Sequence, residues 1–268
     1  MFYLGGTSFP ETREQLISAV TEGIRGLVTL PAGREAVKIE GGEYPSFGKV
    51  TIDLTGARAD IDRLPPEPKG VGQIQPAVSA TQLEIVGRPL YVREAAVDLS
   101  LSARDALFAY DRDAQGRPIL VLMRANDGHV AVEIKKQDAE ALLLGGARDA
   151  AKQQGVQIIE AQLSLTQLDE RSVAAEVRTK AKKLFVTAVV TIRGKLRVDD
   201  ALIATVSDLT CAGQGMLGDL AAKFIGPKLA EVNGRSFPLA ALSLGDVKLH
   251  DLRMLAGDPL RVTAAFGS

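Results

Sequence analysis

The feature of this sequence that most constrains its fold is a two-residue alternation of apolar and polar side chains, which recurs in many segments. In the clearest case, Ile159, Ala161, Leu163 and Leu165 alternate with polar residues. Successive side chains of a β-strand point to opposite faces of a sheet, so this pattern predicts strands with one apolar face. We predict strands at 50–55, 83–85, 97–102, 106–110, 118–123, 129–135, 156–165, 173–179, 184–193, 195–198, 202–210, 244–254 and 259–266.

Helical spacing of apolar side chains is much rarer and is found at 10–28, 138–154 and 216–232. We expect Asp138 to cap the second helix and Pro227 to kink or split the third. The resulting order is helix, many strands, helix, many strands, helix and two strands. Because the strands mostly follow one another, this order predicts an α+β fold with a large, mostly antiparallel sheet instead of alternating βαβ units.

A proline-rich stretch interrupts the strand pattern at 62–76, where four prolines and two glycines predict an irregular connection. A further turn is predicted at Asn126-Asp127-Gly128, between two strands. A chain of 268 residues fits either one large domain or two sub-domains of one body. We predict a single domain over 1–268, with a sub-domain boundary near 62–80 as the alternative.

Residues 213–218 read Gly-Gln-Gly-Met-Leu-Gly and match the GxGxxG pattern of dinucleotide-binding sites. The preceding strand alternates in polarity, whereas strands of a parallel sheet are continuous apolar runs. Pro227 interrupts the following helix, and no short apolar strand ending in an acidic residue comes after it. We therefore predict no nucleotide cofactor, and expect the glycines to allow a strand to turn into a helix that packs close to the sheet.

No other segment carries a convincing catalytic or metal-binding pattern. Residues 111–116 resemble the first half of a calcium loop, but Leu122 stands where the bidentate glutamate would be, so a hairpin turn is predicted. His129 and His250 have no neighbouring ligands at metal spacing, and Cys211 reads as a small buried residue. We predict no metal, no cofactor and no catalytic residue, and hence a protein that is not an enzyme.

Charge and hydropathy limit the partners and the location. The chain has 32 basic and 33 acidic residues and a net charge of -1, which argues against a general nucleic-acid binder. Its single cysteine excludes a disulfide within the chain. The first residues lack the pattern of a signal peptide, and no run of 18 apolar residues is present. We expect a protein that is cytoplasmic or peripheral to a membrane if the chain is complete; a removed leader is left open.

The segment 178–197 contains seven basic residues and no acidic one. One interpretation is a solvated sheet face. The other is contact with anionic lipid headgroups or an anionic membrane surface, where each basic residue contributes about 1 kcal/mol. The residues expected to make this contact are Lys180, Lys182, Lys183, Arg193 and Lys195.

The neighbouring segment 184–192 is apolar on both faces. Leu184, Val186, Val190 and Ile192 share one face, while Phe185 and Val189 lie on the other. A strand with one solvent-exposed face needs apolar side chains only on its other face. Either this strand is buried between layers, or one of its faces lines a cavity for an apolar ligand.

The order of these elements and the placement of the glycines resemble the LmeA-like bacterial phospholipid-binding family. More broadly, the chain resembles the tubular lipid-binding superfamily (TULIP, SMP-like), from about residue 10 onward. The glycine turn at 213–218 and the helix containing Pro227-Lys-Leu also belong to the likeness. The segments that carry it further are Gly48-Lys-Val-Thr-Ile-Asp-Leu, Val130-Ala-Val-Glu-Ile-Lys-Lys-Gln-Asp, Val156–Leu165, Ile192-Arg-Gly-Lys-Leu-Arg-Val-Asp and Leu260-Arg-Val-Thr-Ala-Ala-Phe-Gly.

This resemblance implies an elongated, tubular domain in which a curved, mostly antiparallel sheet wraps around two or three helices. It implies non-enzymatic binding, with transfer as an option, of a lipid, fatty acyl chain or other long apolar ligand in a groove between sheet and helices. The alternative is a structural module with a packed interior and no ligand. The residues expected to line the groove are Leu142, Leu143, Ile159, Leu163, Leu184, Val186, Val190, Leu220, Phe224 and Ile225.

Overall fold

The computed structural model describes residues 1–59, 68–72, 74–152, 157–183, 186–239 and 247–268. The chain divides into two compact units. Unit 1 comprises Met1–Glu133, Ala240–Asp251 and Thr263–Ser268, and unit 2 comprises Ile134–Leu239 and Leu252–Val262. The first change from one unit to the other therefore falls at 133/134. Residues 62–67 and 73 of the predicted connection lie outside the described residues, and Gln75 and Pro76 belong to a strand (β6, Gln75–Val92). A boundary near 62–80 stays a prediction.

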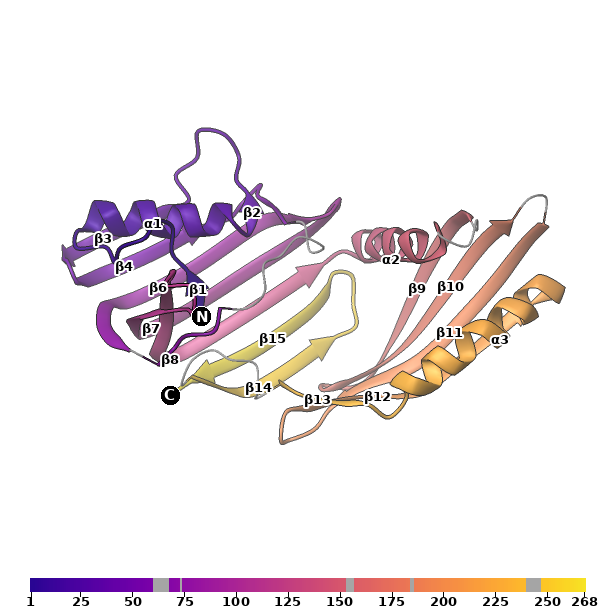
Figure 1. The fold of residues 1–268 in the computed structure, drawn as a ribbon. Coiled ribbons are helices and arrows are strands. Elements are labelled where there is room, and N and C mark those ends of the chain that lie inside the picture. Colours follow the sequence, from indigo (N-terminus) through magenta and orange to yellow (C-terminus); the bar gives the residue numbers. More distant parts are fainter. Residues whose placement is uncertain (60–67, 73, 153–156, 184–185, 240–246) are drawn as a thin grey trace. The chain divides into compact units, whose positions relative to one another are not determined.

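Unit 1 contains one described helix and a mixed sheet that continues into the C-terminal hairpin (Figure 1). The sheet has ten strands in the order β14-β15-β8-β7-β6-β4-β3, and β1, β2 and β5 pair off this path. The pairs β4–β6 and β5–β6 are parallel. Its elements are β1 (Phe2–Tyr3), α1 (Arg13–Arg25), β2 (Val28–Thr29), β3 (Val37–Glu43), β4 (Ser46–Asp53), β5 (Arg58–Ala59), β6 (Gln75–Val92), β7 (Ala95–Arg112), β8 (Pro118–Ile134), β14 (Lys248–Leu255) and β15 (Leu260–Gly267). Residues 252–255 of β14 and 260–262 of β15 are assigned to unit 2.

In its described residues, unit 2 contains two helices and a five-stranded sheet in the order β13-β12-β11-β10-β9. All its strand pairs are antiparallel in the described residues. Its elements are α2 (Lys136–Lys152), β9 (Gln157–Asp169), β10 (Ser172–Lys183), β11 (Val186–Val198), β12 (Ile203–Gln214), α3 (Gly215–Val232) and β13 (Ser236–Pro238).

The predicted predominance of antiparallel strands, with three described helices, is confirmed. The strands nevertheless form two sheets where the sequence predicted one large sheet. Alternation specifies which residues share a face of a strand, but it does not specify which strands become neighbours.

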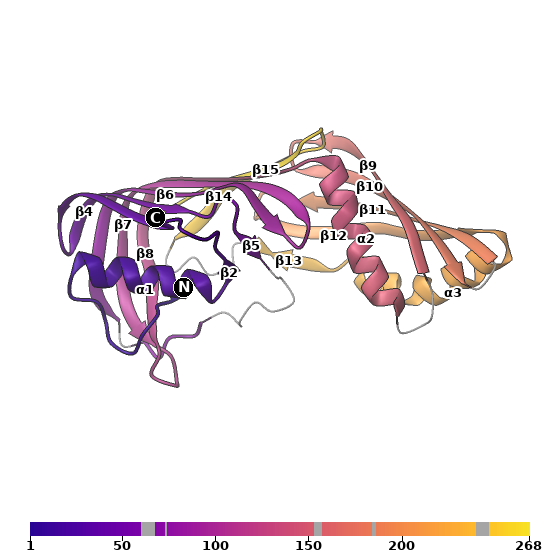
Figure 2. The same cartoon turned by 90° about the horizontal axis from the view of Figure 1, so that it is seen from above.

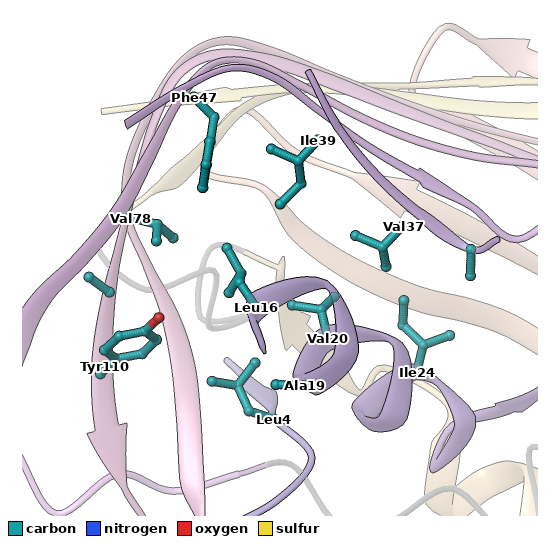
Figure 3. Close-up of a cluster of buried hydrophobic side chains, with 12 residues drawn as sticks. Leu4, Leu16, Ala19, Val20, Ile24, Val37, Ile39, Phe47, Val78 and Tyr110 are labelled. Carbon is teal, nitrogen blue, oxygen red and sulfur yellow. The ribbon is translucent and has the colours of Figure 1, made fainter. Parts of the chain in front are cut away.

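Helix α1 packs against the curved sheet of unit 1 (Figure 2). Thr12 begins the helix, because its side chain accepts a hydrogen bond from the backbone N–H of Gln15 at 3.2 Å. Leu16, Val20 and Ile24 lie on one face and meet side chains of the sheet (Figure 3). The residues of this buried cluster are Leu4, Leu16, Ala19, Val20, Ile24, Ala36, Val37, Ile39, Phe47, Ala77, Val78 and Tyr110.

The predicted turn at Asn126-Asp127-Gly128 is wrong, because β8 runs through it without interruption. Asp127 has a positive φ of 46°, so the strand is irregular there. A Cβ atom on Gly128 would lie 2.3 Å from the Phe266 ring. The glycine therefore makes room for an aromatic ring from β15 within the sheet of unit 1, and does not reverse the chain.

Three predictions in unit 2 also change. Helix α2 begins at Lys136 and contains Asp138 in its first turn, so Asp138 is not the N-cap that was predicted. The backbone N–H of Lys136 donates to the Asp258 carboxylate at 3.0 Å. Helix α3 continues past Pro227 without splitting, and the alternative expectation of a kink stays a prediction. The two strands predicted at 184–193 and 195–198 form the single strand β11.

Candidate functional site

The sheet of unit 2 has one apolar face and one basic face. Residues that pair across antiparallel strands point to the same side. The register therefore places Leu163 of β9, Val177 of β10 and Ile192 of β11 in one row of the apolar face. The next row contains Thr179 and Val190, and it ends at Gly213 of β12.

Helix α2 covers the β9 side of this face. Its Glu140 carboxylate accepts a hydrogen bond from the backbone N–H of Leu163 at 2.8 Å. Its Arg148 guanidinium donates to the backbone carbonyl of Ile158 at 3.1 Å. β9 is an edge strand of the sheet, so these side chains satisfy backbone groups that an edge leaves unpaired. The apolar side chains of Ile158, Ala161 and Leu163 are buried there.

Helix α3 covers the β12 side, and the glycine motif explains how it comes so close. A Cβ atom on Gly213 would lie 1.9 Å from the backbone carbon of Gly218, and one on Gly218 would lie 2.9 Å from the Val189 carbonyl oxygen. Gly215 turns the chain with a φ of +76°. The predicted role of these glycines in turning a strand into a closely packed helix is confirmed. Figure 1 shows α3 running along β11 and β12.

Between the two helices the apolar face is only partly covered. Val177, Thr179 and Ile192 are partly exposed, whereas their neighbours Leu163 and Val190 are buried. Among the described residues, the two clusters of fully buried apolar side chains both belong to unit 1. The centre of the unit 2 sheet therefore presents an accessible apolar strip along β10 and β11.

The structure brings only some of the predicted groove residues to this strip. Leu163 and Val190 lie on the apolar face, and Leu142 and Ile225 are partly buried on α2 and α3. Leu143 and Ile159 are 37% and 41% exposed. Leu184 lies outside the described residues, as do the side chains of Val186, Leu220 and Phe224.

A register shift explains Ile159. Ile158 pairs with Ala181, but Glu160 pairs with Lys180, so the strand carries a bulge at Ile159. Ile158 takes the buried place that the regular alternation assigned to Ile159. Val177 and Thr179 were missed because the β10 segment did not stand out as apolar in the sequence.

The opposite face of the same sheet is basic. Arg178, Lys180 and Lys182 alternate along β10, and their partners on β11 include Val189 and Thr191 on the same side. The register places Arg193, Lys195 and Arg197 on this face as well. These basic side chains are exposed. Lys183 is on β10, but its side chain lies outside the described residues.

Acidic residues of neighbouring positions neutralise part of this face, which the segment 178–197 alone did not reveal. Arg193 Nε lies 2.6 Å from a Glu176 carboxylate oxygen, and Lys195 Nζ lies 2.8 Å from Asp208. Within the described part of the chain, Arg178, Lys180 and Lys182 have no acidic side chain within 4.0 Å.

Two hollows in unit 2 are relevant to ligand binding. One, of about 240 Å³, lies on the basic face and is lined by Glu160, Gln162, Arg178, Lys180 and Val189. The other, of about 500 Å³, lies at the beginning of α2. Its lining is mainly polar and comprises Lys136, Gln137, Glu140, Gln162, Leu163, Ser164 and Asp258.

The residues considered for catalysis lie on different strands, β8, β14 and β12. His129 is exposed on β8 and His250 on β14, both in unit 1, whereas Cys211 lies in unit 2. Cys211 shares the row of Ile192 on the apolar face, and burial raises the pKa of its thiol, which favours the protonated form. In the described ranges, no group of three or more His, Cys, Asp or Glu side chains could hold a metal ion.

The calcium-like segment forms a hairpin turn, as predicted. Asp111 and Asp113 are buried at 3% and 5% exposure. Asp113 accepts hydrogen bonds from the backbone N–H of Gln115 and Arg117 and from Arg117 Nε. Burial alone would raise the pKa of this carboxyl, but these donors outweigh it, and the pKa lies below its usual value. The Asp113 carboxylate thus fixes the turn.

None of the helices in the described residues is long and apolar enough to cross a membrane. Comparison of the chain with protein-family models, with curated proteins and with solved structures finds no match. The functional interpretation therefore rests on the two faces of the unit 2 sheet and on the hollows beside them.

Proposed function

We infer that this protein binds a lipid or another molecule with a long apolar chain, without catalysing a reaction. The ligand lies along the apolar strip of unit 2, between α2 and α3. The observation that carries this proposal is the partial exposure of Val177, Thr179 and Ile192 between α2, which contacts β9, and α3, which contacts β12 and β11. Burial of an acyl chain on this strip is favourable by about 0.8 kcal/mol for each CH₂ group.

The resemblance to the LmeA-like family and to the tubular lipid-binding superfamily supports the same class of ligand. In this proposal, the sheet and helices of unit 2 provide the groove. We also propose the elongated, tubular arrangement of sheet and helices that the resemblance implies. Two predicted residues, Leu163 and Val190, lie on the same face as the partly exposed side chains. The basic face contacts anionic headgroups or an anionic membrane surface.

Two threonines on the central strands provide a matched test. Thr179 of β10 lies on the apolar face, and Thr191 of β11 lies on the basic face, and both are partly exposed. We expect Thr179→Phe to occupy the strip and to lower the uptake of a fluorescent fatty acid or phospholipid at least tenfold, which corresponds to about 1.4 kcal/mol. Thr191→Phe adds the same ring on the other side and is expected to leave uptake unchanged. Equal uptake by both variants would contradict the proposed site.

The second candidate is a structural module without a ligand, and the packed core around α1 favours it for unit 1. The same two variants separate the candidates for unit 2. If side chains filled the strip, Thr179→Phe would overpack it and lower the free energy of unfolding by about 1–3 kcal/mol. If the strip is open, the added ring should leave the stability nearly unchanged, as measured by denaturant unfolding.

A further inference from the structure

The basic face and the apolar strip belong to opposite sides of one sheet layer. Val177 and Arg178 are consecutive on β10, and so are Thr179 and Lys180. Consecutive side chains of a strand point to opposite sides of the sheet. A ligand that lies on the apolar strip therefore cannot have its headgroup among the basic side chains behind the sheet.

We propose that the basic face of unit 2 docks the protein onto an anionic membrane surface. This docking proposal deepens the proposed function. It rests on that function, because it assigns both faces of the sheet to the handling of one lipid ligand. One face holds the apolar ligand. The other brings the protein to the bilayer from which such a ligand is taken or to which it is delivered.

The arrangement of the cations fits an extended anionic surface. Arg178, Lys180 and Lys182 project at two-residue intervals from β10, and Arg193, Lys195 and Arg197 follow on the adjacent strand β11. Two of the six, Arg193 and Lys195, are paired with acidic side chains. The row on β10 has no ion pair within the described residues and supplies most of the attraction.

The hollow on the basic face can hold a lipid phosphate beside the cations of β10. Arg178 and Lys180 both line it, together with Gln162, which can donate a hydrogen bond. The Glu160 carboxylate at the same hollow accepts a hydrogen bond from Gln162 at 2.6 Å. A guanidinium beside an ammonium group is a suitable pair of donors for phosphate oxygens.

The distribution of charge along the chain supports the same orientation. The chain as a whole is nearly neutral, with a net charge of -1. Unit 2 nevertheless contains more basic than acidic residues, whereas unit 1 contains more acidic than basic ones. An anionic surface therefore attracts unit 2 and repels unit 1, an effect that salt weakens.

The test is sedimentation of the full chain with vesicles of phosphatidylcholine, alone or mixed with phosphatidylglycerol. We expect binding to the mixed vesicles and little to the neutral ones, with weaker binding at high salt. Replacement of Arg178, Lys180 and Lys182 by Gln should weaken vesicle binding about 100-fold, at about fivefold for each cation. The matched control replaces three cations of unit 1 by Gln, namely Lys38 on β3, Lys49 on β4 and Arg104 on β7. This variant should bind anionic vesicles at least as well as the unchanged protein.

Three results would overturn this inference: equal binding to neutral vesicles, unchanged vesicle binding by the β10 variant, or equally tight binding of a DNA duplex. A fourth would be loss of fatty-acid uptake by the β10 variant with vesicle binding retained, because the cations would then hold the ligand's headgroup. The proposed function fails separately. If the unchanged protein takes up no apolar ligand but binds anionic vesicles through this row, the ligand site is wrong and the docking surface stands.

Discussion

At the scale of single residues, Gly213 shows how a backbone contact determines a sequence motif. Its neighbour across the strand–helix junction is the backbone of Gly218, so no side chain fits between them. The flanking sequence alone was enough to predict that the GxGxxG match is not a nucleotide site. The close backbone contact that requires glycine could not be predicted from the sequence, because it depends on where α3 packs.

We predict that Gly213→Ala lowers the free energy of unfolding by at least about 1–3 kcal/mol, because the helix must move away from the sheet. Gly146 provides the matched control, since a Cβ atom there meets nothing within 4 Å and the residue lies within α2. Gly146→Ala should raise the stability by about 0.5–1 kcal/mol. Denaturant unfolding measures both. A Gly213→Ala variant as stable as the unchanged protein would contradict the close packing.

Asp113 makes the stability of the hairpin turn depend on pH. Its carboxylate form is favoured in the folded protein, so its pKa is lower than in the unfolded chain. The stability that it provides is present above the unfolded pKa of about 3.9 and is lost as the pH falls through the folded value. We predict that Asp113→Asn is less stable at pH 7, and that its stability falls less than that of the unchanged protein on acidification.

The measurement is denaturant unfolding at several values between pH 7 and pH 2. Asp98→Asn serves as the control, because Asp98 is exposed on β7, the strand that ends just before Asp113. Equal acid sensitivity in the Asp113 variant and the unchanged protein would show that this carboxylate does not stabilise the turn.

At the scale of elements, α2 protects the free edge of the unit 2 sheet. The sequence predicted this helix and strand β9 from their periodicity. It could not indicate that Glu140 accepts from the Leu163 backbone, or that Asp258 caps the first residue of α2, because these contacts join distant segments. The bulge at Ile159 was equally hidden, since an extra residue in one strand leaves the local alternation almost unchanged.

We predict that Glu140→Ala costs about 1–3 kcal/mol, because the Leu163 N–H loses its acceptor while Leu163 is buried. Hydrogen exchange of the Leu163 amide should become at least tenfold faster. Glu140→Gln keeps an acceptor oxygen at this position and should exchange at a rate closer to that of the unchanged protein. If both variants exchange alike, the carboxylate does not protect the edge.

At the scale of the whole molecule, the chain combines two units of different character. Unit 1 has a buried apolar cluster between its helix and its sheet. Unit 2 presents an apolar strip on one face of its sheet and a row of cations on the other. Strand alternation predicted both kinds of face, but the division of strands between two sheets depends on pairing, which alternation does not encode.

The central claim is that purified protein carries an apolar ligand on the strip of unit 2. Native mass spectrometry of the full chain, followed by extraction and identification of lipid, tests it most directly. The account predicts a mass excess that disappears on extraction, is absent from the Thr179→Phe variant and is retained by Thr191→Phe. Recovery of no lipid, together with no uptake of added fatty acid or phospholipid, would contradict it.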